Sequence, residues 1–395
     1  MMKTNAYLTN LTSLRGVAAL LTVVYHVDLM FGNAGGLLLH TADSLMFTRL
    51  YLMVDFFFIL SGFIMLHVYG TSFAGGVTAA SFRKFTLARF ARVYPLHLAT
   101  LLYCIAMFGI AARFGIPANP VGQAANSGYS IVSNLLLLQS MNLHNWFSWV
   151  HASWSISTEW WMYMLFPFLV VPFARIGSTG RAIVVACCFA GYVGIMLWII
   201  PIVTVPASIP FVKVDPASLS INVAYQYGFL RCLFGFVVGM ALYMAYQQSW
   251  GKRWLGNGYT MLALISCALA SLHVAAPDVV TVAFLPLILL SAAYGSRRID
   301  AVLGARPLRT LGDWSFSIYL THQPMLFTVL TIVAYRALSS PRVGAASPPP
   351  ATSLLAAWGE CGLFIALLLV VSSLTYRFVE LPARQRINTW ARGRA

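Results

Sequence analysis

Residues 13–28 read SLRGVAALLTVVYHVD and form most of an apolar run that is long enough to cross a lipid bilayer. The run nevertheless carries Arg15, His26 and Asp28. Ionisable side chains are costly inside a membrane helix, and those that occur usually face a functional cavity or a partner group. The segment therefore predicts both a membrane protein and the position of a site.

The composition of the whole chain is that of a protein with several membrane spans. Of its 395 residues, 59% are hydrophobic and 9% are charged, and the mean hydropathy is +0.78. About a quarter of the residues of a soluble domain are charged. We expect one all-α integral membrane domain over residues 1–395, with no soluble domain. The net charge of +15 is compatible with nucleic-acid binding, but the positions of the basic residues explain it better.

Ten apolar runs are long enough to span a bilayer, and the basic residues indicate their orientation. If the N-terminus is cytoplasmic, 19 Lys and Arg residues fall inside and six outside, as the positive-inside rule requires. Both termini are then cytoplasmic, and nucleic acid is not needed as a partner. Arg15 lies inside the first run, which is unlike a cleavable signal peptide. The predicted spans are 12–31, 48–70, 93–114, 155–174, 182–203, 226–246, 258–276, 279–295, 314–336 and 354–377.

Cysteines and aromatic residues add two further expectations. All six cysteines lie in apolar runs without metal-ligand spacing, which predicts packed thiols, no disulfide and no metal. The longest external connection, 115–153, ends in the aromatic residues Trp146, Phe147 and Trp149. They are interpreted either as a belt at the membrane interface or as a platform for a sugar ring.

Arg15 and His26 are expected to share one face of the first helix. Eleven residues at 100° each return to within about 20° of the same direction, with an axial separation of about 16 Å. Arg15 then lies at the cytoplasmic edge and His26 deeper, past the midplane. Alternatively, Arg15 is a snorkelling anchor and His26 a packing residue. An arginine suits a phosphate and a histidine a general base, so the pair suits acyl-coenzyme A, with its phosphate head and reactive tail.

Further segments share a recognisable order along the chain: VDFFFILSGF at 54–63, RFARVYP at 89–95, WSISTE at 154–159, SIYLTHQP at 317–324 and ELPAR at 380–384. Together with the spacing of Arg15 and His26, they resemble the acyltransferase 3 family, whose members modify bacterial surface and exported carbohydrates. Trp160, Trp161 and Thr321 depart from the family pattern. The esterase-like domain that some relatives carry is not expected either.

The resemblance implies an enzyme of the bacterial inner membrane. It would transfer an acyl group, acetyl being the expected one, from cytoplasmic acetyl-CoA to a hydroxyl of an exported carbohydrate such as exopolysaccharide. The alternative is a carbohydrate or lipid transporter with an intramembrane proton relay. A transporter would move its substrate without consuming acyl-CoA. The oligomeric state stays open.

The resemblance also suggests roles for two arginines of the third span region. Arg89 and Arg92 are three residues apart and share a helix face, so with Arg15 they would bind the coenzyme phosphates. The alternative is that they only signal topology, as expected for Arg83 and Lys84.

The reacting groups are expected at His26 and Glu159. His26 would act as the general base or, alternatively, as an acyl-carrying nucleophile. Glu159 would accept a hydrogen bond from the His26 ring and orient it. Alternatively, Glu159 is a charge in the first turn of a helix. Asp28 is a weaker candidate for orienting His26, because it points to another side of the helix.

Three more residues are assigned to substrate binding: Asp55, Tyr319 and His322. Asp55 would pair with an arginine or bind an acceptor hydroxyl. Tyr319 and His322 are expected in the inner half of the ninth span, nearer the donor than His26. His322 is interpreted as a pocket residue or a structural residue and not as a second base. Ser61 and Gly62 would permit close helix approach, and Glu380 and Arg384 would pair at the inner surface.

Overall fold

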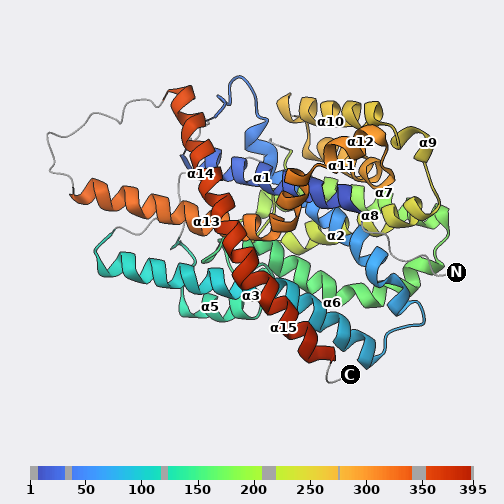
Figure 1. Ribbon diagram of the computed structural model, residues 1–395, viewed down its shortest axis with the longest axis horizontal. Coiled ribbons are helices and arrows are strands. Elements are labelled where there is room, and N and C mark those ends of the chain that lie inside the picture. Colours follow the sequence, from blue (N-terminus) through green and yellow to red (C-terminus); the bar gives the residue numbers. More distant parts are fainter. Residues whose placement is uncertain are drawn as a thin grey trace.

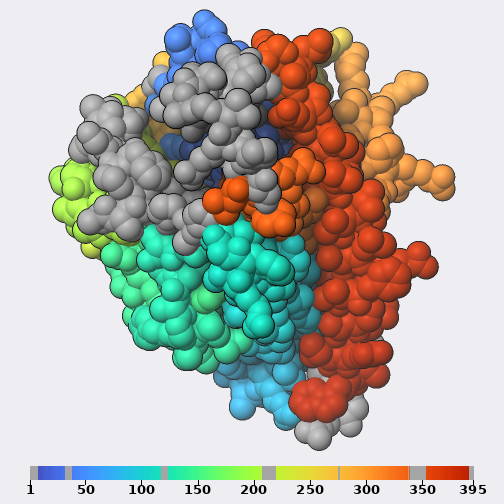
Figure 2. Space-filling model, turned by 90° about the vertical axis from the view of Figure 1, so that its left-hand side faces the viewer, coloured from blue at the N-terminus to red at the C-terminus, as the bar shows by residue number. Residues whose placement is uncertain are grey.

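The computed structural model describes residues 8–31, 38–116, 123–206, 219–274, 276–339 and 353–392, and every regular element among them is helical. Figure 1 shows long helices, several of them nearly parallel, with α14 and α15 crossing the others obliquely. In Figure 2 the same C-terminal helices run along one side of the molecule. The prediction of an all-α chain is confirmed for this part.

Each predicted span coincides with one long helix. Shorter elements connect them, including η2 (Phe47–Leu52), η3 (Gly70–Phe73), α5 (Gly128–Leu135), α9 (Lys252–Leu255), α12 (Arg297–Leu303), η7 (Tyr376–Glu380) and α15 (Leu381–Arg392). Two short elements, η4 (Ile195–Ile199) and η5 (Ile200–Ile202), continue α7. The long helices are α1 (Thr9–Phe31), α2 (Met53–Tyr69), α3 (Ala79–Arg113), α6 (Ser153–Arg175), α7 (Ser178–Gly194), α8 (Gly228–Gln247), α10 (Gly258–His273), α11 (Asp278–Tyr294), α13 (Arg306–Ser339) and α14 (Leu354–Thr375).

Seven helical stretches of the described chain are long and apolar enough to cross a membrane, and the bent pair α11 and α12 would make an eighth. α10 is apolar but has only 16 residues. α6 has the length of a span, but hydroxyl side chains and Glu159 lower the hydropathy of its first third. The chain is thus a multi-pass helical membrane protein, while the count of ten and the cytoplasmic termini stay predictions.

Two helices begin well before their apolar runs. α3 begins at Ala79 and not near residue 93, because Thr78 and Ser81 form a capping box in which the Thr78 side chain accepts from the Ser81 backbone N–H. α13 begins at Arg306 and not near residue 314. The earlier start of α3 places Arg89 and Arg92 within a regular helix.

Glycines allow two pairs of helices to pack with their backbones in contact. α1 packs most extensively against α13, and a Cβ atom on Gly16 would lie 2.5 Å from the Gly312 nitrogen. α2 meets α8 in the same way, since a Cβ on Gly62 would lie 1.9 Å from the Phe236 carbonyl oxygen. Small residues permit such close approach in membrane proteins. The prediction for Gly62 is confirmed, and the α1–α13 contact positions the site.

The aromatic segment before α6 packs into the interior. Trp146 and Trp149 are only 6% and 9% exposed and belong to the main hydrophobic core. Both interpretations made from the sequence are therefore wrong for these two indoles, because an interfacial belt and a sugar platform each need an accessible ring.

Candidate active site

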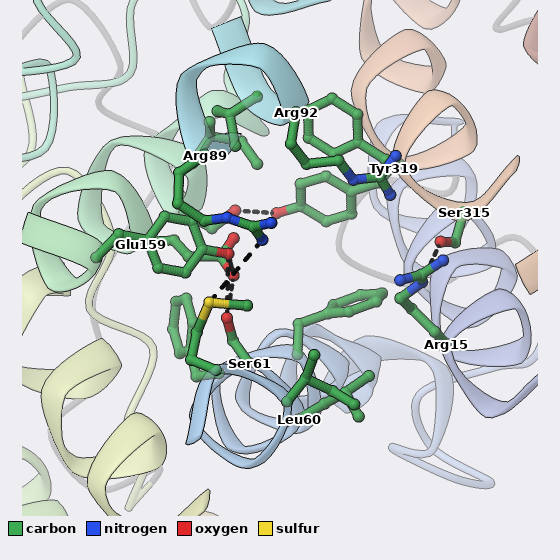
Figure 3. A pocket seen from close by; sticks show the side chains of 17 residues that line it. Arg15, Leu60, Ser61, Arg89, Arg92, Glu159, Ser315 and Tyr319 are labelled. Carbon is green, nitrogen blue, oxygen red and sulfur yellow. Dashed lines mark hydrogen bonds between the residues drawn. The ribbon is translucent and has the colours of Figure 1, made fainter. Parts of the chain in front are cut away.

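A cavity of about 150 Å³ lies between α1, α2, α3, α6 and α13. It brings together Arg15, Arg89 and Arg92, the three residues predicted to bind one donor molecule. Figure 3 shows the three guanidinium groups around this space, with Glu159 and Ser61 on one side and the Tyr319 ring beside Arg92. We call it the arginine cavity.

Arg15 is held against α13. Its Nε donates to the Ser315 hydroxyl and its Nη2 to the Gly312 carbonyl, both at 2.7 Å. The close α1–α13 contact makes both bonds possible. These bonds tie the guanidinium to a neighbouring helix, while the interpretation of Arg15 as a snorkelling anchor stays open.

Arg89 is surrounded by tyrosines. Its Nη2 donates to the Tyr69 hydroxyl at 2.7 Å, and the guanidinium carbon lies 5.0 and 5.8 Å from the ring centroids of Tyr69 and Tyr163. Its buried Nε has no hydrogen-bond partner among the described residues. Arg89 therefore retains a donor for a ligand.

Arg92 forms an ion pair with Glu380, which is 1% exposed and also accepts from the Ser317 hydroxyl at 3.1 Å. The predicted pair of Glu380 with Arg384 is wrong. Because α15 packs on α3, the Glu380 carboxylate pairs with Arg92 of α3 instead. Arg384 nevertheless lies close enough to act electrostatically on Arg92, as do Arg15 and Arg89.

Positive charge exceeds negative charge around the arginine cavity. The two carboxylates of this region, Glu159 and Glu380, stand against four arginines. Like charges that gather in a partly buried site repel one another unless an anion compensates them. The cavity is therefore suited to an anionic group such as a phosphate.

Glu159 lines the arginine cavity, which His26 does not, and is bound to other groups. Its carboxylate accepts hydrogen bonds from the Ser61 hydroxyl at 2.5 Å and from the Tyr163 hydroxyl. It also interacts electrostatically with Arg89 and Arg92. The predicted bond from His26 to Glu159 is wrong, because α6 faces α2 and α3 at this level while His26 lies against α13. Glu159 is also the seventh residue of α6 and lies past its first turn. The alternative interpretation, a charge in the first turn of a helix, is therefore wrong too. Tyr163 follows Glu159 by four residues and lies on the same helix face. This spacing would have predicted the bond between them, but the sequence analysis did not use it.

The side-chain partner of His26 is His322 and not Glu159. Its Nδ1 lies 2.9 Å from the Thr22 carbonyl oxygen and 3.2 Å from Nε2 of His322. His322 is completely buried, and the two ring centroids are 4.8 Å apart. The expected depth of His322, nearer the donor than His26, is therefore wrong: the close crossing of α1 and α13 brings the two rings to one level.

The hydrogen bonds also define which nitrogen of His26 is basic. A carbonyl oxygen can only accept, so the proton of the neutral His26 ring lies on Nδ1. His322 Nε2 faces the same proton and must likewise be an acceptor. Nε2 of His26 then retains its lone pair, as a general base requires.

Tyr319 lies between the arginine cavity and the two histidines. Its hydroxyl is 2.7 Å from the Ser155 hydroxyl and donates to the Ala152 carbonyl at 3.2 Å. Its ring lines the cavity and lies 5.8 Å from the His322 ring. Phe57 packs edge-on against it with a centroid distance of 5.6 Å. Tyr319 and Phe57 therefore both line the cavity, and Tyr319 connects it to the His322 ring.

Asp55 does not line this site. It is fully buried and forms an ion pair with Arg231, whose Nη2 lies 2.6 Å from Oδ2. Tyr192 also donates to it at 3.4 Å. Its assignment to substrate binding is wrong, because its oxygens are already occupied and no surface of it is accessible, whereas its expected pairing with an arginine is confirmed. Asp28 accepts from the Leu38 backbone N–H at 2.8 Å.

The described residues contain no group of three His, Cys, Asp or Glu side chains placed to hold a metal ion. The site that the structure describes consists of a paired histidine beside a cavity lined by arginines.

The chain is similar to proteins that transfer acyl groups. A sequence model described as "Acyltransferase domain" (Acyl_transf_3) matches residues 8–377. "Acyltransferase MdmB" of Streptomyces mycarofaciens is 28% identical over 342 residues, which cover 80% of this chain and 78% of that protein. "Protein 2 in picA locus" of Rhizobium radiobacter is 34% identical over 158 residues, which cover 38% of this chain and 75% of that protein.

The name of a more distant relative states its acceptor. "Peptidoglycan O-acetyltransferase OatA" of Listeria monocytogenes serovar 1/2a is 19% identical over 397 residues, which cover 96% of this chain but only 56% of that protein. No solved structure matches the chain.

Proposed function

The chain belongs to the acyltransferase 3 family, and from this premise we propose that it transfers an acyl group, acetyl being the expected one, from acyl-CoA to a hydroxyl of an exported carbohydrate such as exopolysaccharide. The observation that carries the proposal is the convergence of Arg15, Arg89 and Arg92 on one cavity, with Tyr319 between that cavity and the paired histidines. The relative named as a peptidoglycan O-acetyltransferase supports a carbohydrate acceptor.

We place the donor on the cytoplasmic side of a bacterial inner membrane. The distribution of basic residues favours this orientation, with ten spans and both termini inside. Arg89 has a buried Nε donor without a partner among the described residues. Arg92, now paired with Glu380, would exchange that carboxylate for a phosphate of the coenzyme. Arginine suits this exchange because its planar fork binds either oxyanion in the same way.

Glu159 takes a different role from the one expected of it. Its carboxylate lies near the charges of Arg89 and Arg92 and accepts from Ser61 and Tyr163. We assign it to positioning the donor-binding arginines and the wall of the cavity. The role of orienting His26 passes to the Thr22 carbonyl and to His322.

The transfer itself uses Nε2 of His26. This nitrogen removes the proton of the acceptor hydroxyl, the oxygen attacks the thioester carbonyl, and the bond from carbon to sulfur breaks. The proton held on the imidazolium then passes to the departing CoA thiolate, so that no other reactant is needed. The Nδ1–H remains bonded to Thr22 and His322 throughout, which stabilises the imidazolium.

Tyr319 and Phe57 must admit the thioester to His26. Both rings line the arginine cavity, whereas His26 does not, and the cavity's 150 Å³ holds only part of a coenzyme. We assign Tyr319 to contact with the pantetheine arm and the acyl group. An acyl-histidine formed at Nε2 is the alternative chemistry, and trapping a labelled acyl-enzyme by rapid quenching distinguishes the two routes.

The test is acetyl-CoA turnover by purified protein in liposomes with a crude cell-surface glycan extract as acceptor. We expect release of CoA that needs the acceptor, disappears in His26→Ala and requires more donor in Arg89→Ala. Arg83→Ala is the matched control, since Arg83 is an exposed arginine on the same helix. Protein that neither binds nor consumes acetyl-CoA or longer acyl-CoAs would contradict the proposal and favour the transporter.

A further inference from the structure

A second hollow, of about 500 Å³, lies apart from the arginine cavity. It forms where residues 124–129 and 142–145 meet Gln226, and none of its lining residues lines the arginine cavity. Its polar lining consists of Asn126, Ser127, Tyr129, Asn142, His144, Asn145 and Gln226. We call it the amide hollow.

Among the described residues that line the amide hollow, none is a Lys, Arg, Asp or Glu. This neutrality is notable in a chain with a net charge of +15. Burial lowers the pKa of His144 below its ordinary value, so this ring is also uncharged at neutral pH. A phosphate or a uronic acid would find no counter-charge among the described lining residues. A neutral polar molecule needs none.

The rim of the amide hollow is held in place by its own hydrogen bonds. Asn142 Oδ1 accepts from the Tyr227 backbone N–H at 2.7 Å, and both residues have a φ of 57°. Asn126 Oδ1 accepts from the Trp149 backbone N–H at 2.6 Å. Residues other than glycine keep such left-handed conformations only where the surroundings enforce them. The hollow is therefore preformed, which lowers the entropic cost of binding.

Several groups in the hollow remain available to a ligand. Within the described part of the chain, neither the Asn142 NH₂ group nor the Asn145 amide has a protein partner. Tyr129 is 59% exposed and packs edge-on against His144 at 5.3 Å between centroids, while His144 is bonded to the Ser133 hydroxyl at 2.7 Å. An exposed ring beside amides offers an apolar face for C–H groups and donors and acceptors for hydroxyls.

We propose that the amide hollow is a subsite that holds a neutral sugar residue of the acceptor glycan. This inference rests on the proposed function and specifies its acceptor as an uncharged chain of two or more sugar residues. The connection between α3 and α6, which supplies most of the hollow, is predicted to be external, where an exported carbohydrate would be presented.

The subsite lies beside the reacting groups and not among them. Trp146 and Phe147, which follow the hollow in sequence, pack on Tyr225 at 5.2 and 4.8 Å between centroids. Farther along, Ala152 donates its N–H to Gln323, the residue after His322. These contacts link the segment that lines the hollow to α13 beside His322. On the proposal, a sugar bound in the hollow is a neighbour of the sugar that reacts.

The experiment measures acceptor kinetics and binding for Tyr129→Ala and Asn145→Ala. The control is Tyr259→Ala, which removes another exposed tyrosine, on α10 and outside the hollow. The acceptors are a size series from one to six residues, prepared from the neutral fraction of the surface glycan. We expect the KM of the long acceptors to rise about tenfold in both variants, with kcat, the KM of acetyl-CoA and the KM of the monosaccharide unchanged.

Wild-type values in the two hollow variants, or an equal effect on the monosaccharide, would overturn the subsite. Binding of the same oligosaccharides, followed by saturation-transfer NMR, gives a readout that needs no turnover. We expect neutral chains to bind and to lose affinity in Tyr129→Ala but not in Tyr259→Ala. A preference for acidic chains, or no binding of neutral ones, would overturn the subsite. Turnover that fails with every acceptor and donor would instead overturn the proposed function.

Discussion

Nε2 of His322 lies 3.2 Å from Nδ1 of His26, on a helix that begins almost 300 residues later in the chain. The Thr22 carbonyl shares the same Nδ1 proton. The two acceptors together direct the lone pair of His26 to Nε2. His322 is therefore a positioning residue, which acts on the reaction through His26.

Replacing His322 should affect turnover but not donor binding. We expect His322→Leu to lower kcat about a hundredfold, because the imidazolium of His26 loses one acceptor, and His322→Gln to recover part of this loss through its amide oxygen. His26→Ala should lose about a thousandfold, in the usual range for a general base. The KM of acetyl-CoA should stay constant in all three. Equal kcat values for His322→Leu and wild type would contradict the role.

Replacing Arg89 should affect the donor. Loss of a charge-assisted hydrogen bond to phosphate corresponds to about tenfold or more in affinity, so we expect the KM of acetyl-CoA to rise by that factor in Arg89→Ala. Arg89→Lys should not restore it, since an ammonium group lacks the planar fork. Isothermal titration with CoA measures the same change without turnover. An unchanged affinity beside the Arg83→Ala control would exclude Arg89 from the donor site.

Replacing Gly312 tests the contact between α1 and α13. A Cβ atom there would lie 2.1 Å from the Thr12 carbonyl oxygen, so Gly312→Ala must separate the helices and should lower stability by about 1–3 kcal/mol. It should also lower kcat, because it moves His322 from His26. The control is Gly109→Ala on α3, where a Cβ meets nothing within 4 Å. Thermal unfolding in detergent and turnover should change together in Gly312→Ala and not in Gly109→Ala.

Replacing Asp55 distinguishes a structural ion pair from an acceptor site. Asp55→Asn leaves Arg231 buried without its counter-charge, which costs about 3–5 kcal/mol. The double variant Asp55→Leu with Arg231→Met should be more stable than Asp55→Asn, as both charges are then removed. Protein that stays folded in either case should keep the wild-type KM for the acceptor. A raised acceptor KM without loss of stability would return Asp55 to substrate binding.

The helices could be predicted from the sequence because their signals are local. Apolar runs of span length match all ten long helices in position, and the three-residue spacing of Arg89 and Arg92 brought both to one cavity. The starts of α3 and α13 were missed, because their first turns are polar and carry no hydropathy signal. The Thr78 and Ser81 capping box was a readable sign of the earlier start.

The contacts between helices could not be predicted in the same way. Glu159 was assigned to His26 although it bonds to Ser61 and Tyr163, and Glu380 was assigned to Arg384 although it pairs with Arg92. Both errors concern partners on other helices. An ionisable residue in a membrane helix signals that it has a partner, but nothing in its own sequence neighbourhood says which helix supplies that partner.

The sequence by itself determined which segments are helical, that the chain is a membrane protein and which arginines share a face, because these properties depend on the composition and period of single segments. Only the tertiary structure decided that His26 meets His322, that Asp55 meets Arg231 and that Trp146 is buried. These pairings depend on how closely two backbones approach at residues such as Gly16 and Gly312. An apolar helix face packs equally well against lipid or against any of several neighbours, so the choice among them belongs to the assembled bundle.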